Sequence, residues 1–187
     1  MSDFIEKEFK DHSIVLKKTI KSVIPSIEAA AGLIIDSLRS NGKLIIFGNG
    51  GSAADSQHMA SEFTGRFLKK RDGLPALALT TDSSAITAIA NDFGFDNIFS
   101  RQIEAIASPK DTVLGISTSG KSLNVLNAFK KSKEMGCNII SLTGNNGGKM
   151  RDTVDVNINV SSEDTPRIQE IHILIIHILC GLCEDNL

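Results

Sequence analysis

The stretch Lys43-Leu-Ile-Ile-Phe-Gly-Asn-Gly-Gly-Ser52 decides the fold class, because it passes from a short apolar run into a glycine-rich turn. A short apolar run bounded by glycines predicts a buried strand. The residues that follow, at about 53–65, have apolar positions at helical spacing. This part of the chain therefore predicts a strand that leads through a tight turn into a helix.

The same alternation of apolar runs and helical patterns continues along the chain. Further strands are predicted at 75–80, 112–117, 138–143 and 154–160, and helices at about 83–91, 97–107, 121–135 and 165–184. Strands that alternate with helices predict a parallel sheet with helices on both faces. The last run alternates apolar and polar residues from Val154 to Val160, which is typical of an edge strand.

Two helices are predicted ahead of the first strand. Residues 4–23 have a helical pattern of mixed charge, and Pro25 is expected to break it. Ser26 can cap a second helix, which Asn41 and Gly42 are expected to end. The 187 residues show no linker and no repeat, so one domain is expected, with N-terminal helices over 1–40 and an α/β core over 43–187.

Composition and charge exclude several classes of function. The formal net charge is -2 and the chain has no Trp or Tyr, so we expect no nucleic-acid partner. The N-terminus MSDFIEKEFKDH contains charges of both signs and no apolar segment, so it is no signal peptide and a cytoplasmic location is expected. The longest apolar stretch, 171–182, is interrupted by His172 and His177, and it is too short and too polar to predict a membrane span.

Three cysteines, Cys137, Cys180 and Cys183, suit a reducing compartment because their number is small and odd. Cys180 and Cys183 form a C-x-x-C pattern. A redox motif of that spacing opens a helix, whereas this one closes a long helical pattern, so buried apolar side chains are favoured over a redox or metal site.

Two loops after predicted strands are candidates for binding a phosphate. In parallel sheets, ligands bind beyond the carboxyl ends of the strands. The first loop, Gly48-Asn-Gly-Gly-Ser52, lets a ligand approach the backbone at a helix N-terminus, although a plain tight turn has the same sequence. The second, Ser117-Thr-Ser-Gly-Lys-Ser122, places four hydroxyls and a glycine at another helix N-terminus, which is typical of a phosphate cradle.

The second loop also matches the nucleotide-binding pattern G-x-x-x-x-G-K-[ST] from Gly115 to Ser122. A nucleoside triphosphatase usually has this motif after its first strand and needs a carboxylate at the end of another strand to hold Mg²⁺. Here the motif follows the third predicted strand, and the later strands end in Ser141-Leu-Thr-Gly and Asn159-Val-Ser-Ser, without a carboxylate. A phosphate site of another kind is therefore favoured.

Two predicted helices contain candidates for the chemistry. His58 and Glu62 share one helix face, so they can hold a metal, place a base beside a ligand, or form an ordinary surface pair. In the last helix, His177 lies among isoleucines, where a buried core histidine is an equal alternative. Its partner on that helix is Gln169 or Glu170, and the spacing does not choose between them.

Asn91 and Asp92 end the helix after the second strand. Their side chains can bond sugar hydroxyls, but residues of these types also stop helices without any further role. Both interpretations stay open on the residues alone.

Taken together, five segments in this order resemble the sedoheptulose-7-phosphate isomerase (phosphoheptose isomerase) family of the SIS domain. They are GNGGSAADSQHMASEFTGRF, LTTDSSAITAIANDFGF, GISTSGKSLNVL, SLTGNNGGKM and RIQEIHILIIHIL, and they cover nearly the whole chain. The resemblance implies an α/β fold: one SIS-type three-layer αβα domain with a five-stranded parallel sheet, preceded by N-terminal helices.

The resemblance also implies roles at the matching positions. Substrate-binding positions are Asn49, Gly50, Gly51, Glu62, Asn91, Asp92, Ser117, Thr118, Ser119, Ser122 and Gln169. Zinc-binding positions are His58, Glu62, Gln169 and His177, so the family selects Gln169 over Glu170. Glu62 and His177 match the family's acid–base pair, and Lys121 matches none of these positions.

The activity implied is conversion of sedoheptulose 7-phosphate to D-glycero-D-manno-heptose 7-phosphate by a homotetramer, in lipopolysaccharide or capsule biosynthesis. Three alternatives come from the same superfamily: a non-catalytic SIS protein that binds a protein partner, an SIS isomerase of another sugar phosphate, and the sensor domain of a transcription regulator. The retained Glu62, His58, Gln169 and His177 favour an enzyme over a binding protein. A regulator normally needs a fused DNA-binding domain, for which 187 residues leave no room.

Overall fold

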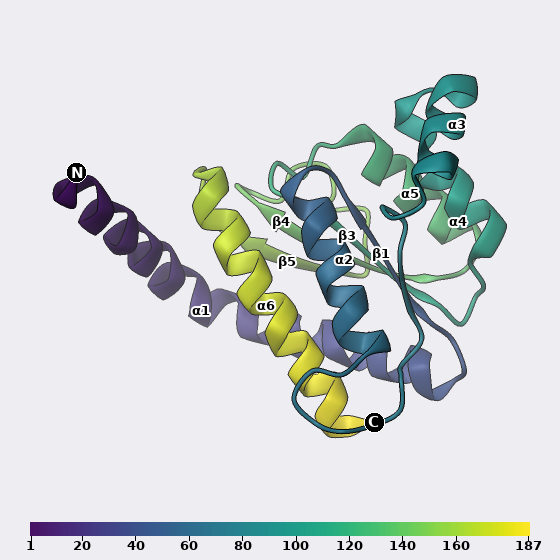
Figure 1. Ribbon diagram of the computed structural model, residues 1–187, viewed down its shortest axis with the longest axis horizontal. Coiled ribbons are helices and arrows are strands. Elements are labelled where there is room, and N and C mark those ends of the chain that lie inside the picture. Colours follow the sequence, from purple (N-terminus) through teal and green to yellow (C-terminus); the bar gives the residue numbers. More distant parts are fainter.

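A five-stranded parallel sheet forms the centre of the computed structural model, which describes residues 1–187 (Figure 1). The strands are β1 (Leu44–Gly48), β2 (Ala76–Ala78), β3 (Thr112–Ser117), β4 (Asn138–Gly144) and β5 (Val156–Val160), in the order β2-β1-β3-β4-β5. Every residue of β1 and β3 is buried, as expected of continuous apolar runs in the middle of such a sheet. The alternating strand β5 lies at an edge, which confirms that prediction.

Helices cover both faces of the sheet, so the predicted three-layer α/β architecture is confirmed (Figure 1). They are α1 (Ser2–Arg39), α2 (Gly51–Thr64), α3 (Ser83–Phe93), α4 (Ser100–Ile106), α5 (Leu123–Glu134) and α6 (Thr165–Asn186), with a short 3₁₀ turn at Phe95–Asn97. Ile46 and Leu114 pack with α1, α2 and α6 on one face, whereas Ile45 and Val113 pack with α4 and α5 on the other. The strict alternation of strand side chains thus divides the core in two.

The prediction of two N-terminal helices was wrong, because α1 continues through Pro25 as a single helix. A proline inside a helix costs about 3 kcal/mol through its lost hydrogen bond and its steric clash. Val23 and Ile27, on either side of Pro25, are both buried in the core beneath the sheet, while Pro25 itself is exposed. Burial of this flanking apolar face offsets the proline, and Ser26 donates back to the Val23 carbonyl instead of capping a new helix.

The helix α6 is longer than the apolar stretch recognised in the sequence. By length and composition alone it is able to cross a membrane, but half of its most apolar part is buried inside the fold. It packs against both α1 and α2. The stretch 171–182 considered in the sequence is only part of this helix, and the burial of α6 is that of a core helix.

The three cysteines are buried and unpaired. Burial raises the pKa of Cys180 and of Cys183 to about 12, and that of Cys137 to about 11. All three thiols are therefore protonated at neutral pH and lack the thiolate that redox or metal chemistry needs. The prediction that the C-x-x-C pattern consists of buried apolar side chains is confirmed.

His172 is fully buried where α6 crosses β4. Its Nε2 donates to the Thr143 carbonyl at 3.0 Å, and its Nδ1 has no partner. Burial lowers the pKa of His172 to about 4, and the bond to Thr143 opposes that shift only in part.

We expect the free energy of unfolding to fall as the pH falls from 6.5 towards 4. In that window the unfolded chain binds a proton at His172 that the folded chain does not bind, which removes on the order of 3 kcal/mol of stability. Urea unfolding at pH 7.5 and pH 5 measures the loss. His172→Leu should show a smaller loss over the same interval; an unchanged pH dependence in that variant would contradict the assignment.

Candidate active site at the carboxyl edge of the sheet

The order of the strands fixes where a ligand can bind. The chain passes from β1 outward to β2 and then returns to place β3 on the other side of β1. The loops after β1 and β3 therefore leave in opposite directions and open a crevice between them, which is where parallel sheets bind ligands. The two loops singled out in the sequence, beginning at Gly48 and at Ser117, are these two loops.

The loop after β1 is joined to the helix after β3 by a pair of amides. Asn49 donates to the Asn124 side chain at 2.9 Å, and Asn124 donates back to Asn49 at 2.8 Å. Gly50 has a backbone φ of +57°, a conformation that favours glycine. The reciprocal amides hold Asn49 beside the start of α5, so the two loops act as one surface.

The loop after β3 gathers its hydroxyls at the N-terminus of α5. Ser117 Oγ lies 3.0 Å from Ser122 Oγ and 3.4 Å from Ser119 Oγ. Ser122 stands at the N-cap, but its side chain accepts no N–H from α5, so those backbone donors stay available to an anion. Thr118 is half-buried in the same turn, and its carbonyl accepts from Asn145 at 3.1 Å. The four hydroxyl residues thus form a cradle suited to a phosphate monoester.

The resemblance to a nucleotide-binding P-loop does not extend to the structure. Gly115 and Ile116 belong to β3 rather than to a loop. A Cβ at Gly115 would overlap the ring of Phe129, so this glycine serves the packing of α5 on the sheet. The interpretation as a phosphate loop of another kind is therefore favoured.

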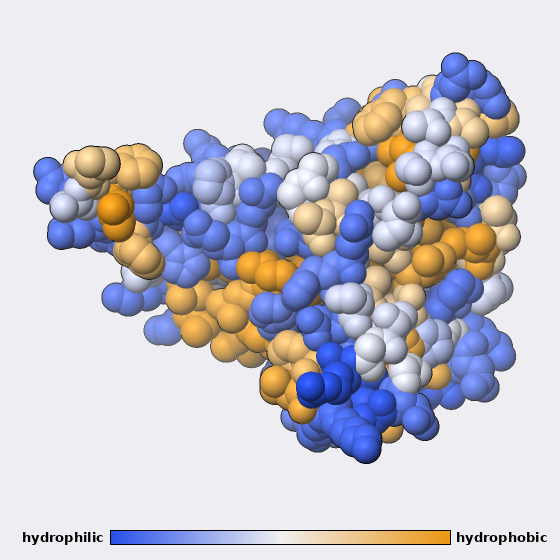
Figure 2. Space-filling model, viewed as in Figure 1, coloured by the Kyte–Doolittle hydropathy of each residue, from blue (hydrophilic) through white to orange (hydrophobic).

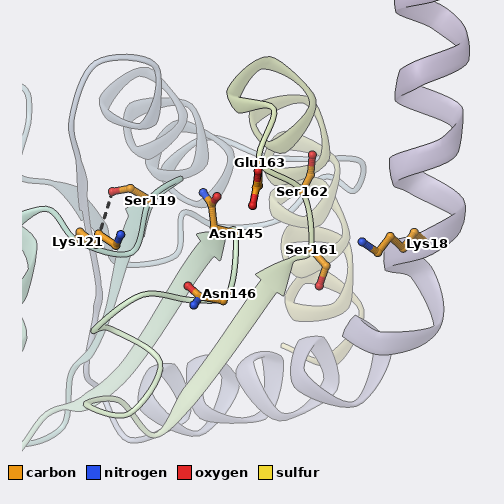
Figure 3. A pocket seen from close by; sticks show the side chains of 8 residues that line it. All are labelled: Lys18, Ser119, Lys121, Asn145, Asn146, Ser161, Ser162 and Glu163. Atoms are coloured by element: carbon orange, nitrogen blue, oxygen red, sulfur yellow. Dashed lines mark hydrogen bonds between the residues drawn. The ribbon is translucent and has the colours of Figure 1, made fainter.

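A polar cavity of about 660 Å³ lies beside the loop after β3, over the ends of β4 and β5 (Figure 3). No hydrophobic side chain lines it. The lining residues are Lys18, Ser119, Lys121, Asn145, Asn146, Ser161, Ser162 and Glu163. Figure 3 shows Ser119 and Lys121 on one side and Lys18, from α1, on the other. The cavity is large enough for a phosphorylated sugar and offers mainly hydrogen-bonding groups.

The chemical groups predicted on α2 and α6 meet at the packed faces of these two helices. His58 Nε2 lies 3.0 Å from His177 Nε2 and 3.4 Å from Glu62 Oε1. The Glu62 side chain is 20% exposed and that of His58 is 44% exposed, so both are open to a ligand. His177 is half-buried, which excludes the alternative of a fully buried core histidine.

Gln169 and Glu170 point to different surroundings. A Cβ placed on Gly51 would lie 2.5 Å from the Gln169 side-chain nitrogen, so Gln169 packs against the first loop. Glu170 instead pairs with His12 at 2.7 Å and with Arg167 at 2.6 Å, away from that loop. The rotation of α6 about its axis therefore places Gln169, and not Glu170, at the site.

His58, Glu62, Gln169 and His177 have the types of donor atom that zinc accepts, namely imidazole nitrogen and side-chain oxygen. No group of three His, Cys, Asp or Glu side chains is arranged as a complete metal centre. His58 Nε2 nevertheless lies near both His177 Nε2 and Glu62 Oε1, so the donor types and this approach are compatible with such a ligand set.

Asn91 and Asp92 are not brought together with the other predicted residues in a single chain. They lie on α3, a helix without a buried residue, and both are exposed. Their one side-chain hydrogen bond joins Asn91 to Asp92 at 2.7 Å. In Figure 1, α3 stands away from α6.

Most of the residues around the polar cavity were not predicted from the sequence. Asn145 and Asn146 directly follow β4, and Ser161 follows β5. Because ligands bind beyond the carboxyl ends of parallel strands, the predicted strand ends were enough to indicate these residues. Lys18 belongs to α1, far away in the sequence, and no local pattern indicates its position.

The chain matches the SIS domain family over residues 9–144. It is 52% identical over 187 residues to a phosphoheptose isomerase of Geotalea daltonii, covering 100% of this chain and 97% of that protein. It is 49% identical over 187 residues to the one of Aliarcobacter butzleri, covering 100% and 99%.

Solved structures of two phosphoheptose isomerases have the same fold. The structure from Neisseria gonorrhoeae gives a TM-score of 0.94 at 42% identity, with 98% of both chains covered. The structure from Francisella tularensis gives 0.95 at 35% identity, with 98% of this chain and 97% of that chain covered. The fold, the order of the loops and these likenesses agree, and the chain belongs to the phosphoheptose isomerases of the SIS domain family.

Proposed function

We propose that this protein is an aldose–ketose isomerase that converts sedoheptulose 7-phosphate into D-glycero-D-manno-heptose 7-phosphate. The observation that supports this most directly is the meeting of His58, Glu62 and His177, in a chain of this family, with Gln169 of the same α6 packed on the glycine loop after β1. Membership of the family indicates the substrate. The positions of His58, Glu62 and His177 indicate an acid–base reaction.

The reaction moves a proton between two adjacent carbons of the sugar. A base removes the proton from the carbon beside the carbonyl, an enediol forms, and the proton returns to the neighbouring carbon. Glu62 suits the role of base because its carboxylate is only partly exposed. His177, whose Nε2 lies 3.0 Å from the Nε2 of His58, suits the role of the acid that serves the sugar oxygens.

The phosphate end of the substrate would be held by the loop after β3. Ser117, Thr118, Ser119 and Ser122 offer hydroxyls, and the start of α5 offers backbone N–H groups. Binding at this remote end orients the reacting carbons toward Glu62, because part of the binding energy is then used for positioning.

We also propose zinc as a cofactor, held by His58, Glu62, Gln169 and His177. When bound, it would polarise the substrate carbonyl and stabilise negative charge on the oxygens. A carboxylate engaged fully by a metal is a weaker base. The base role of Glu62 therefore needs one of its oxygens to remain free for the substrate.

A homotetramer with sites shared between subunits is part of the same proposal. An apolar groove of about 240 Å³ lies between α1 and α6, with ten hydrophobic residues among its twelve lining residues. Figure 2 shows apolar surface over this region. The exposed position of Asn91 and Asp92, apart from the other site residues, also suits a site completed by a second subunit.

We place the protein in the cytoplasm, in the synthesis of lipopolysaccharide or capsule. The heptose product of the phosphoheptose isomerases supports the pathway. A non-catalytic binding role is the second candidate. The presence of Glu62 together with both histidines disfavours it, because a binding protein has no need of an acid–base pair.

The test is turnover of sedoheptulose 7-phosphate by the purified protein in D₂O, followed by NMR. An aldoheptose 7-phosphate that contains deuterium at the exchanged carbon is the expected product. Fructose 6-phosphate and ribulose 5-phosphate serve as comparison substrates. Removal of metal by a chelator should lower the rate, and added zinc should restore it; an unchanged rate without metal would overturn the zinc proposal. No turnover with intact phosphosugar binding would favour the binding role.

A further inference from the structure

A buried carboxylate near the end of α6 has no place in the roles assigned above. The Glu184 side chain is 2% exposed. One of its oxygens accepts the backbone N–H groups of Leu68 and Lys69, both at 2.7 Å. The other accepts from the Phe67 backbone at 3.1 Å and from the Arg71 guanidinium at 3.0 Å.

These four bonds fix the connection between α2 and β2, which begins directly after Thr64. Burial by itself raises the pKa of Glu184, but the three backbone N–H groups and Arg71 outweigh it and the pKa is lowered. The carboxylate is therefore ionised. A neutral side chain of similar size could not accept all four of these hydrogen bonds with the same strength. Removal of the charge would release the loop.

Arg71 extends this contact to the end of α2. Its guanidinium donates to the Glu62 carbonyl at 2.8 Å and to the Phe63 carbonyl at 2.9 Å. A cation that satisfies the last carbonyls of a helix stabilises that end. The backbone of Glu62 is thus held by the same cluster that holds the loop.

Phe67 extends the contact to His177. The two rings are stacked, with centroids 5.6 Å apart and an angle of 25° between their planes. Gly181, one turn further along α6, leaves room for the Phe67 ring, since a Cβ there would lie 3.6 Å from a ring carbon of Phe67. One face of the imidazole therefore lies on Phe67, while Nε2 points to His58.

We infer that Glu184, Arg71 and Phe67 form a positioning clamp, which fixes the ring of His177 and the backbone of Glu62 in the orientation that proton transfer requires. This inference rests on the proposed function for its effect on the rate, but its geometry is independent of it. None of the three residues touches the reacting atoms. Phe67 acts through the His177 ring and Arg71 through the Glu62 backbone, and Glu184 holds both of them.

The decisive variant is Phe67→Leu, which removes the stacked ring and leaves Glu184 and its bonds to the loop backbone. We expect kcat to fall about 10- to 100-fold, because small displacements of catalytic groups have effects of that size. KM should stay within about twofold, since the phosphate loop is untouched. Phe67→Tyr keeps the ring and should restore kcat, and Leu68→Ala, an exposed side chain on the same loop, should behave as wild type.

A second readout does not depend on turnover. The imidazole ¹⁵N and ¹H signals of His177, assigned by their absence in His177→Gln, should shift or broaden in Phe67→Leu and remain as in wild type in Phe67→Tyr. Glu184→Gln should produce the same change and also lower the melting temperature.

The outcomes separate the two proposals. A wild-type protein that lacks isomerase activity would defeat the proposed function, while the His177 signals would still test the clamp. Wild-type kcat and unchanged signals in Phe67→Leu would overturn the clamp. A loss of kcat with an equal loss of folding that Phe67→Tyr does not rescue would also overturn it, because the role of Phe67 would then be structural only.

Discussion

Glu62→Gln and His177→Gln are each expected to lower kcat for sedoheptulose 7-phosphate by about 10²- to 10⁴-fold, the usual contribution of a general acid or base. Glutamine has nearly the size of glutamate but cannot accept a proton at neutral pH. At position 177 it cannot supply one. Both side chains are partly exposed, so the fold should persist, with the melting temperature within a few degrees of wild type.

The measurement is kcat and KM for each variant, together with deuterium incorporation from the solvent. Glu62→Gln should stop incorporation, because the base that exchanges the proton is gone. Glu170→Gln is the matched control: it makes the same chemical change on α6, but Glu170 pairs with His12 and Arg167 away from the site. A variant of Glu62 or His177 with a near-normal rate would remove that residue from the mechanism.

Gly120→Ala is expected to lower kcat/KM about 100-fold, mainly through KM. Gly120 lies in the phosphate loop with a φ of +63°, and a Cβ there would overlap the Gly147 carbonyl in the loop after β4. The Gly120 carbonyl also accepts from the Met150 backbone at 3.2 Å. Accommodation of the methyl group must separate the two loops and displace Ser119, at a cost of about 1–3 kcal/mol in stability.

Gly136→Ala separates the steric clash from the cost of the backbone conformation. Gly136 has a φ of +79°, but the nearest atom to its Cβ would be Pro109 Cβ at 3.4 Å, and it lies between α5 and the start of β4. We expect a loss of about 1–2 kcal/mol in stability with KM unchanged. Isothermal titration with inorganic phosphate, together with the measurement of KM, tests both variants. If Gly120→Ala bound phosphate as wild type does, the assignment of this loop to phosphate binding would be contradicted.

Much of the fold follows from local pattern. The predicted strands at 112–117 and 138–143 match β3 and β4 closely, because apolar runs bounded by turn residues have few alternatives in a chain of this composition. The main wrong prediction was a helix break at Pro25. A local rule predicts a break there, but burial of Val23 and Ile27 by distant parts of the chain decided the matter.

The sequence by itself determined which loops lie at the carboxyl edge of the sheet and that His58 and Glu62 share a helix face. Both features depend on short-range geometry, namely the direction of parallel strands and the pitch of a helix. Only the tertiary structure decided that His177 lies 3.0 Å from His58, and that Gln169 rather than Glu170 packs on the first loop. The rotation of α6 about its axis sets these contacts. That rotation is fixed by packing against α1 and α2, far away in the sequence, and no local period encodes it.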